Sequence, residues 1–212
     1  MSLALHSLTL AWQDSPQPLL TDFSLCIAPG EIAVIQGPSG CGKSTLLSAI
    51  AGTAPPELLI SGAISLDGQA IEATPPEARG IGILFQDALL FPHLTVAQNL
   101  AFGLPSHLTR AERQQAVARA LEDAGLADYG PRDPAHLSGG QKARIAMMRA
   151  MLSAPKALLM DESFASLDPH LRTQFGQFVA NRIATQNIPA LLISHHVDDK
   201  AFATGQVIDW PC

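Results

Sequence analysis

Residues 37–45, with the sequence GPSGCGKST, constrain the fold of this chain more than any other segment. They match the pattern G-x-x-x-x-G-K-[ST], a glycine-rich loop that surrounds phosphate groups. The fixed positions of the pattern are Gly37, Gly42, Lys43 and Ser44. The apolar run at 31–36 predicts a buried strand before the loop, and 44–52 predicts a helix after it. An ordinary glycine turn is the alternative, but a strand before and a helix after favour phosphate binding.

The residue types in this loop suit a triphosphate and a magnesium ion. Glycine lets the backbone curl so that consecutive N–H groups point at phosphate oxygens. Lys43 is expected to reach the β- and γ-phosphates, and the Ser44 hydroxyl to ligate Mg²⁺. The residues predicted to contact the nucleotide here are Gly37, Ser39, Gly40, Cys41, Gly42, Lys43, Ser44 and Thr45.

Two acidic residues end a second apolar run, KALLMDE at 156–162. Carboxylates at the carboxyl end of a strand lie where ligands bind in α/β sheets. Asp161 is therefore predicted to hold Mg²⁺, and Glu162 to orient the water that attacks the γ-phosphate and to accept its proton. A solvated acidic turn is the alternative, and the phosphate loop in the same chain argues against it.

Two further polar residues end apolar runs, Gln86 after GIGILF and His195 after PALLIS. The Gln86 amide could touch Mg²⁺ or water, and an ordinary loop glutamine remains the alternative. His195 could hydrogen-bond the γ-phosphate, although a histidine at a strand end often has a structural role.

The patterning predicts an α/β fold in a single domain. The four apolar runs at 31–36, 80–86, 156–162 and 189–195 suit an interior sheet. Alternating segments near 3–12, 22–28 and 62–67 suit antiparallel strands, and the pattern is helical from 95 to 152. We expect a core made of 1–86 and 153–212, with an antiparallel β subdomain, and a helical subdomain at 87–152.

Composition excludes several other functions. The chain has 212 residues with a net charge of −6, and its 13 lysines and arginines are scattered. No nucleic-acid partner is expected, because a phosphate backbone needs clustered positive charge. Cys26, Cys41 and Cys212 are too few and too widely spaced to predict a disulfide framework or a zinc site.

A second candidate anion site is LSGGQ, residues 137–141, before a predicted helix that begins by Lys142. Ser138 stands where a hydroxyl caps free N–H groups, and the two glycines allow a ligand to approach the backbone. A helix start of this kind attracts an anion. Because the loop at 37–45 already provides a phosphate site, the residues alone leave open which anion the second site binds.

Together these motifs resemble the ATP-binding subunits of ABC transporters, in the family's order and over nearly the whole chain. The resemblance implies a P-loop NTPase ABC cassette with a RecA-like core, with ATP and Mg²⁺ as cofactors. Gln86 matches the family's Q-loop, Asp161 and Glu162 the Walker B segment, and His195 the switch histidine. The resemblance implies catalytic roles for Glu162, His195 and Gln86. It also implies a magnesium site formed by Ser44, Gln86 and Asp161, and stacking of adenine on Trp12.

In this family two cassettes face each other head to tail, so the second anion site would bind the ATP of the partner subunit. The resemblance assigns this role to Ser138, Gly139, Gly140 and Gln141, and places Asp168 at the dimer seam. A homodimer is the expected form. Ser163 and His196 depart from the family pattern, in which proline and an acidic residue are usual.

Residues 83–104 resemble the importer type, as in thiamine-type importers, in a short form without a regulatory C-terminal domain. Leu89, Leu90, Phe91 and His93 would then contact a membrane permease, or else pack in the core. The expected partners are permease subunits, a second ATPase subunit and, indirectly, a substrate-binding protein. The expected location is the cytoplasmic side of the membrane, as a peripheral protein.

Three alternatives remain for the function. The chain could be an exporter or lipoprotein-release ATPase, a soluble ABC ATPase, or a cassette that only binds nucleotide.

Overall fold

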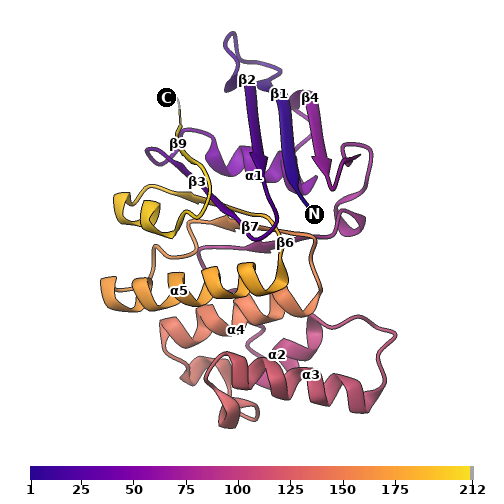
Figure 1. Cartoon of the computed structure of the whole chain (residues 1–212), viewed down its shortest axis with the longest axis vertical. Coiled ribbons are helices and arrows are strands. Elements are labelled where there is room, and N and C mark those ends of the chain that lie inside the picture. The colour runs from indigo at the N-terminus through magenta and orange to yellow at the C-terminus, as the bar shows by residue number, and fades with distance from the viewer. Residues whose placement is uncertain (211–212) are drawn as a thin grey trace. The chain divides into compact units, whose positions relative to one another are not determined.

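The computed structural model describes residues 1–210 (Figure 1). The chain divides into two compact units. The first unit contains Met1–Ile83, Lys156–Glu162 and the chain from Ala180 onward. The second unit contains Leu84–Pro155 and Ser163–Val179.

The first unit holds a five-stranded sheet with the order β6-β7-β8-β3-β9. The strands are β3 (Ile32–Gln36), β6 (Ile81–Leu84), β7 (Ala157–Asp161), β8 (Ala190–Ser194) and β9 (Val207–Asp209). β3 pairs in parallel with both β8 and β9, and β7 pairs in parallel with β8. The four apolar runs of the sequence are all strands of this sheet, as predicted. The Ile, Leu, Val and Ala side chains of β3, β7 and β8 are buried because such strands are covered on both faces, whereas Ile81 and Ile83 of the edge strand β6 are only partly buried.

A four-stranded antiparallel sheet completes the strands of this unit, with the order β2-β1-β4-β5. Its strands are β1 (Leu3–Trp12), β2 (Leu20–Ile27), β4 (Leu58–Leu66) and β5 (Gln69–Ala70). The three antiparallel strands predicted from alternation are confirmed. β4 begins four residues before the predicted segment at 62, because Leu58, Leu59 and Ile60 pair with the end of β1.

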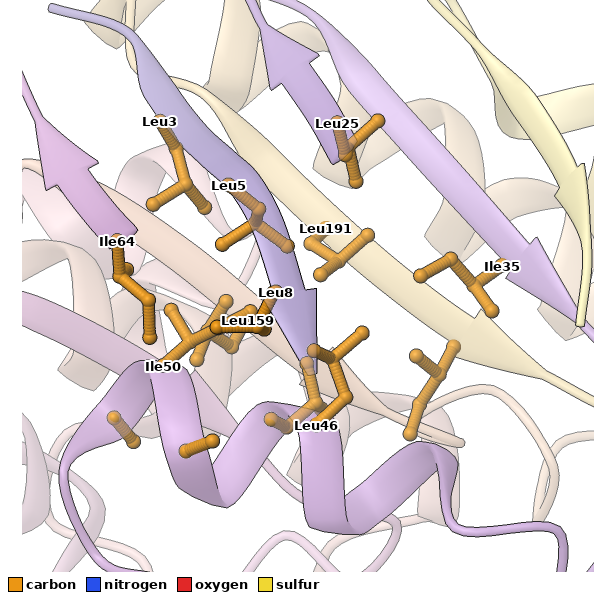
Figure 2. Packing of buried hydrophobic residues seen from close by; sticks show 14 of the residues in the cluster. Leu3, Leu5, Leu8, Leu25, Ile35, Leu46, Ile50, Ile64, Leu159 and Leu191 are labelled. Atoms are coloured by element: carbon orange, nitrogen blue, oxygen red, sulfur yellow. The ribbon is translucent and has the colours of Figure 1, made fainter. Parts of the chain in front are cut away.

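The core of the first unit lies around helix α1 (Lys43–Ala51), which directly follows the glycine-rich loop. Leu46 and Ile50 of this helix are fully buried. Figure 2 shows them among side chains from strands of both sheets, including Leu8 and Leu159. Burial of each such side chain contributes about 1.5–3 kcal/mol, so this packing fixes the direction of α1.

The second unit is helical and has its own apolar core. Its helices are α2 (Val96–Phe102), α3 (Arg110–Asp123) and α4 (Gly139–Leu152), with short 3-10 helices at Ala127–Tyr129 and Pro134–His136. Thr95, Thr109 and Ser138 cap the three α-helices through capping boxes. The box at Ser138 starts α4 three residues before Lys142, where the sequence pattern becomes helical.

Three further elements complete the described chain. Helix α5 (Pro169–Gln186) begins in the second unit and ends in the first, and 3-10 helices occupy Pro76–Ala78 and Val197–Phe202. Among residues 1–210, no helix is both long and apolar enough to cross a membrane.

The carboxyl end of α1 depends on Arg79, which is 7% exposed. Its guanidinium donates to the carbonyls of Ala49 and Ile50 at 3.0 and 2.7 Å, and to those of Thr74 and Glu72. Burial lowers the pKa of Arg79, partly offset by the negative charge of Glu72. Two of the free carbonyls in the last turn of α1 are therefore satisfied by one side chain.

We predict that Arg79→Met destabilises the protein by about 2–4 kcal/mol, because several buried carbonyls lose their donor. For a chain of this size that lowers Tm by roughly 4–16 °C. Thermal unfolding followed by circular dichroism measures it, with Arg119→Met on the exposed face of α3 as the matched control. An equal, small change in both variants would contradict the role of Arg79.

Candidate functional site

Four strands of the five-stranded sheet end side by side at one edge. In the pairing register Gln36 of β3 lies beside Ser194 of β8 and Asp209 of β9, and Asp161 of β7 lies beside Ile193 of β8. Because these strands are parallel, the residues that follow each of them gather at the same edge. This arrangement brings together the predicted loop, the two acidic residues and His195, all within the first unit.

The phosphate loop ends in a helix start without a cap. No side chain hydrogen-bonds the first turn of α1, whereas α2, α3 and α4 are each capped by a hydroxyl. Gly40 and Gly42 have φ of +83° and +85°, a left-handed conformation that suits glycine and turns N–H groups inward. The free N–H groups and the helix dipole make this an anion site.

Lys43 places its ammonium group inside this loop. The side chain is 4% exposed, and Nζ donates to the carbonyls of Gly37 and Pro38 at 2.8 and 2.5 Å. Leu19, from the segment after β1, covers the loop so closely that a Cβ on Gly42 would lie 2.4 Å from its Cδ1. Trp12 ends β1 and is 37% exposed, so part of its ring is open to a ligand.

Ser44 and Asp161 form a pair of oxygen ligands. Ser44 Oγ donates to Asp161 Oδ1 at 3.1 Å. Burial raises the pKa of Asp161, and the hydrogen bond from Ser44 partly offsets this. A hydroxyl beside a half-buried carboxylate fits Mg²⁺, which is usually held by one or two carboxylates together with water and substrate phosphates.

Glu162 and His195 form the second pair. His195 Nδ1 lies 3.1 Å from Glu162 Oε2. Glu162 has φ of +48°, a strained conformation for a non-glycine residue, and its N–H donates to the carbonyl of Ile193 at 3.0 Å. Strain of this kind collects at functional sites, where the surrounding structure holds it in place. The carboxylate is thus positioned as a proton acceptor, and the imidazole as its neighbour.

Sequence reasoning missed a hydrogen-bonded pair, Ser194 and Asp199, beside His195 in the chain. Ser194 Oγ donates to Asp199 Oδ2 at 2.6 Å and accepts the N–H of His196 at 3.0 Å. Asp199 is 1% exposed, whereas its neighbour Asp198 is exposed. No signal in the sequence distinguishes these two aspartates, because their difference depends on where the chain turns after β8.

The cysteines differ from the sequence-based expectation in one respect. Cys41 is disulfide-bonded, and Cys26 is free and exposed. Cysteine number and spacing alone do not reveal which sulfur atoms meet in space.

The remaining predicted site residues lie in the second unit. Ser138 and Gly139 are exposed at the start of α4, whereas Gly140 is buried beside Leu171. Ser138 Oγ accepts the N–H of Gln141 at 3.3 Å, and the Gln141 side chain accepts the N–H of Ser138 at 2.9 Å.

Gln86 and Asp168 have different surroundings within this unit. Gln86 is exposed and lines a cavity of about 120 Å³ together with Gly139 of α4. Asp168 accepts the N–H groups of His170 and Leu171 at 3.1 and 3.0 Å, so it caps α5. The sequence did not predict this structural role.

Comparison with known proteins identifies the family. The ABC transporter family profile matches residues 20–165. YnjD of Escherichia coli (strain K12), an uncharacterized ABC transporter ATP-binding protein, is 45% identical over 191 residues, which cover 90% of this chain and 88% of YnjD. ThiQ of Escherichia coli O157:H7, a thiamine import ATP-binding protein, is 42% identical, with 88% and 80% covered. The chain therefore belongs to the ATP-binding proteins of ABC transporters.

A solved structure agrees with this assignment. CbiO1 of Clostridium perfringens, part of the ABC transporter complex CbiONQ, matches with a TM-score of 0.87 and 28% identity, covering 98% of this chain and 83% of that one. The resemblance and the fold class inferred from the sequence are confirmed. The protein is an ATPase subunit of an ABC transporter.

We predict that Asp161→Asn leaves the metal-free protein as stable as the unmodified chain, or raises its Tm at pH 7 by up to about 4 °C. Burial disfavours the charged form of Asp161, and the neutral amide avoids that cost. The difference should fade as the pH falls through the raised pKa, because Asp161 then takes up its proton.

The same variant should lose the Mg²⁺ dependence of nucleotide affinity, measured by titration calorimetry with and without the metal. Asp14→Asn, at an exposed position of the same unit, is the control. A strongly destabilised metal-free Asp161→Asn protein would contradict this description of the site.

Proposed function

We propose that this chain hydrolyses ATP at the seam between two copies of itself and so powers solute import through a membrane permease. The observation that carries the proposal is the sheet edge where the Ser44–Asp161 pair and the Glu162–His195 pair meet an uncapped helix start. This edge offers groups for phosphate binding, for metal binding and for proton transfer. The import direction rests on the likeness to ThiQ, a thiamine import ATP-binding protein.

The roles of the residues follow from their chemistry. The loop N–H groups and Lys43 bind the phosphates, and Trp12 offers its ring to the adenine. Ser44 and Asp161 would hold Mg²⁺, which would neutralise charge on the phosphates. Glu162 orients the attacking water and accepts its proton. His195 holds the Glu162 carboxylate in place, and the imidazole also hydrogen-bonds the γ-phosphate.

The signature segment is suited to an ATP held by another copy. Ser138 Oγ accepts one hydrogen bond within its own helix start, so its hydrogen stays available to donate to a γ-phosphate. Ser138 and Gly139 are exposed, as a surface that binds in trans requires. We assign Gly140 and Gln141 to shaping this surface, because Gly140 is buried and Gln141 closes the capping box. Asp168 is exposed next to α5 and would lie at the seam.

An apolar surface in the second unit supports contact with a permease. Leu89 and Phe102 are 57% and 66% exposed, and the rings of Phe91 and Phe102 lie 4.6 Å apart. Arg149 of α4 donates to the carbonyl of Leu89 at 3.0 Å, which ties this surface to the signature helix. Contact with a permease here would place the chain at the cytoplasmic side of the membrane as a peripheral subunit, with a substrate-binding protein as an indirect partner.

We predict that Glu162→Gln lowers kcat by about 10²–10⁴-fold, the usual contribution of a general base. Lys43, Ser44 and Asp161 remain, so MgATP should still bind. Because ATP that bridges two copies stabilises only the dimer, the variant should be monomeric without nucleotide and dimeric with MgATP, with two ATP per dimer. Size-exclusion chromatography with light scattering and a nucleotide count measures both quantities.

Adding Ser138→Arg to Glu162→Gln should abolish the dimer, because the bulky side chain stands at the seam. Each monomer should still bind one ATP through its own loop. If the double variant loses ATP as a monomer, the assignment of LSGGQ to the partner's nucleotide is wrong. If Glu162→Gln alone binds ATP but never dimerises, the proposed seam between two free copies is wrong.

A further inference from the structure

Trp210 contacts the phosphate loop, and no motif in the sequence assigns it a role. It directly follows β9, which pairs with β3 beside the loop (Figure 1). The side chain is 5% exposed and belongs to the core of the first unit. Tryptophan buried to this degree usually has a partner for its N–H.

Three contacts join Trp210 to the loop. Its main-chain N–H donates to the carbonyl of Gln36 at 2.6 Å, just before the loop begins. Its indole Nε1 donates to the carbonyl of Cys41 at 2.6 Å, within the loop. Its Cβ lies 2.9 Å from the place where a Cβ on Gly37 would stand, so only glycine fits there.

These contacts act on the main-chain carbonyl of Cys41 and on Gly37 at the start of the loop. The loop carbonyls need donors as well as its N–H groups, and Lys43 donates to those of Gly37 and Pro38 but not to that of Cys41. The indole of Trp210 supplies the donor for Cys41, and the contact with Gly37 fixes the start of the loop. A loop already held in its binding shape loses less conformational entropy when the ligand arrives.

We propose that Trp210 is a positioning residue for nucleotide binding, which holds the phosphate loop in its binding curvature before ATP arrives. The proposal rests on the function proposed above for the loop. It concerns affinity and not the chemical step, because bound nucleotide itself orders the loop once the site is saturated.

The test is Trp210→Phe, which keeps an apolar ring and removes the N–H donor. The Kd for MgADP, measured by titration calorimetry, and the KM for MgATP should both rise about fivefold, as expected for one hydrogen bond. The kcat at saturating MgATP should stay within twofold. If Trp210 only stabilised the fold, the substitution would reduce the fraction of active protein. The apparent kcat would then fall and the Kd would stay unchanged, which is the opposite result.

Two controls separate the hydrogen bond from packing and from sulfur chemistry. Phe23→Leu removes the ring that packs 5.9 Å from Trp210 but keeps the indole donor, so Kd should stay within twofold. Cys41→Ser keeps the main-chain carbonyl and removes the disulfide, so Trp210→Phe should cost the same factor in that background.

Each outcome decides the proposal. A Kd for Trp210→Phe within twofold of the unmodified chain, an equal loss in Phe23→Leu, or no loss in the Cys41→Ser background overturns it. Lys43→Ala tests the proposed function separately and should abolish MgADP binding. If Lys43→Ala binds MgADP normally, the assignment of the loop is wrong, whatever Trp210→Phe shows.

Discussion

The open first turn of α1 is the feature on which the site depends. Four N–H groups at the start of a helix have no partner within it, and a protein normally satisfies them with a side chain. This chain does so for α2, α3 and α4 but not for α1. At its other end α1 is closed by Arg79, and its middle is buried through Leu46 and Ile50. The fold thus buries the middle of α1 and provides hydrogen-bond donors at its carboxyl end, but leaves the N–H groups of its first turn without a side-chain cap.

The parallel sheet determines what stands around that open end. Four of its strands contribute the residues that follow them: the loop after β3, Glu162 after β7, His195 after β8 and Trp210 after the edge strand β9. An antiparallel arrangement would send alternate strand ends to the opposite edge. The close spacing also has a cost, because Glu162 adopts a left-handed conformation to leave β7 and still reach His195. Its hydrogen bond to Ile193 of the neighbouring strand holds that conformation.

Much of the fold and of the site could be predicted from the sequence, because the relevant signals are local. The buried strands are continuous apolar runs, the capping box at Thr109 lies within four residues, and the loop at 37–45 is one uninterrupted segment. Sequence reasoning missed the contact between Trp210 and Cys41 because these residues are 169 positions apart. It missed the contact between Ser194 and Asp199, five positions apart, because that contact depends on where the chain turns after β8. The family motif predicts that Asp168 lies at the dimer seam and does not reveal that its carboxylate caps α5. A short motif does not separate a structural role from a functional one when one side chain can serve both.

The two anion sites differ in a way that bears on why the protein would dimerise. The start of α1 combines free N–H groups, curled glycines and Lys43, so it can hold a phosphate without help. At the start of α4, the hydrogen bonds of the capping box already occupy the Ser138 N–H and the Gln141 N–H, and Gly140 is buried. Only the Ser138 hydroxyl and the exposed Gly139 remain to contact an anion. We infer that the second site is too weak to bind an anion alone and engages one only when another copy already holds it. In the proposed dimer, binding energy from the weak site would appear as dimer stability and would be lost when hydrolysis releases the γ-phosphate. A stronger second site would bind free phosphate and lose this dependence on the partner's nucleotide.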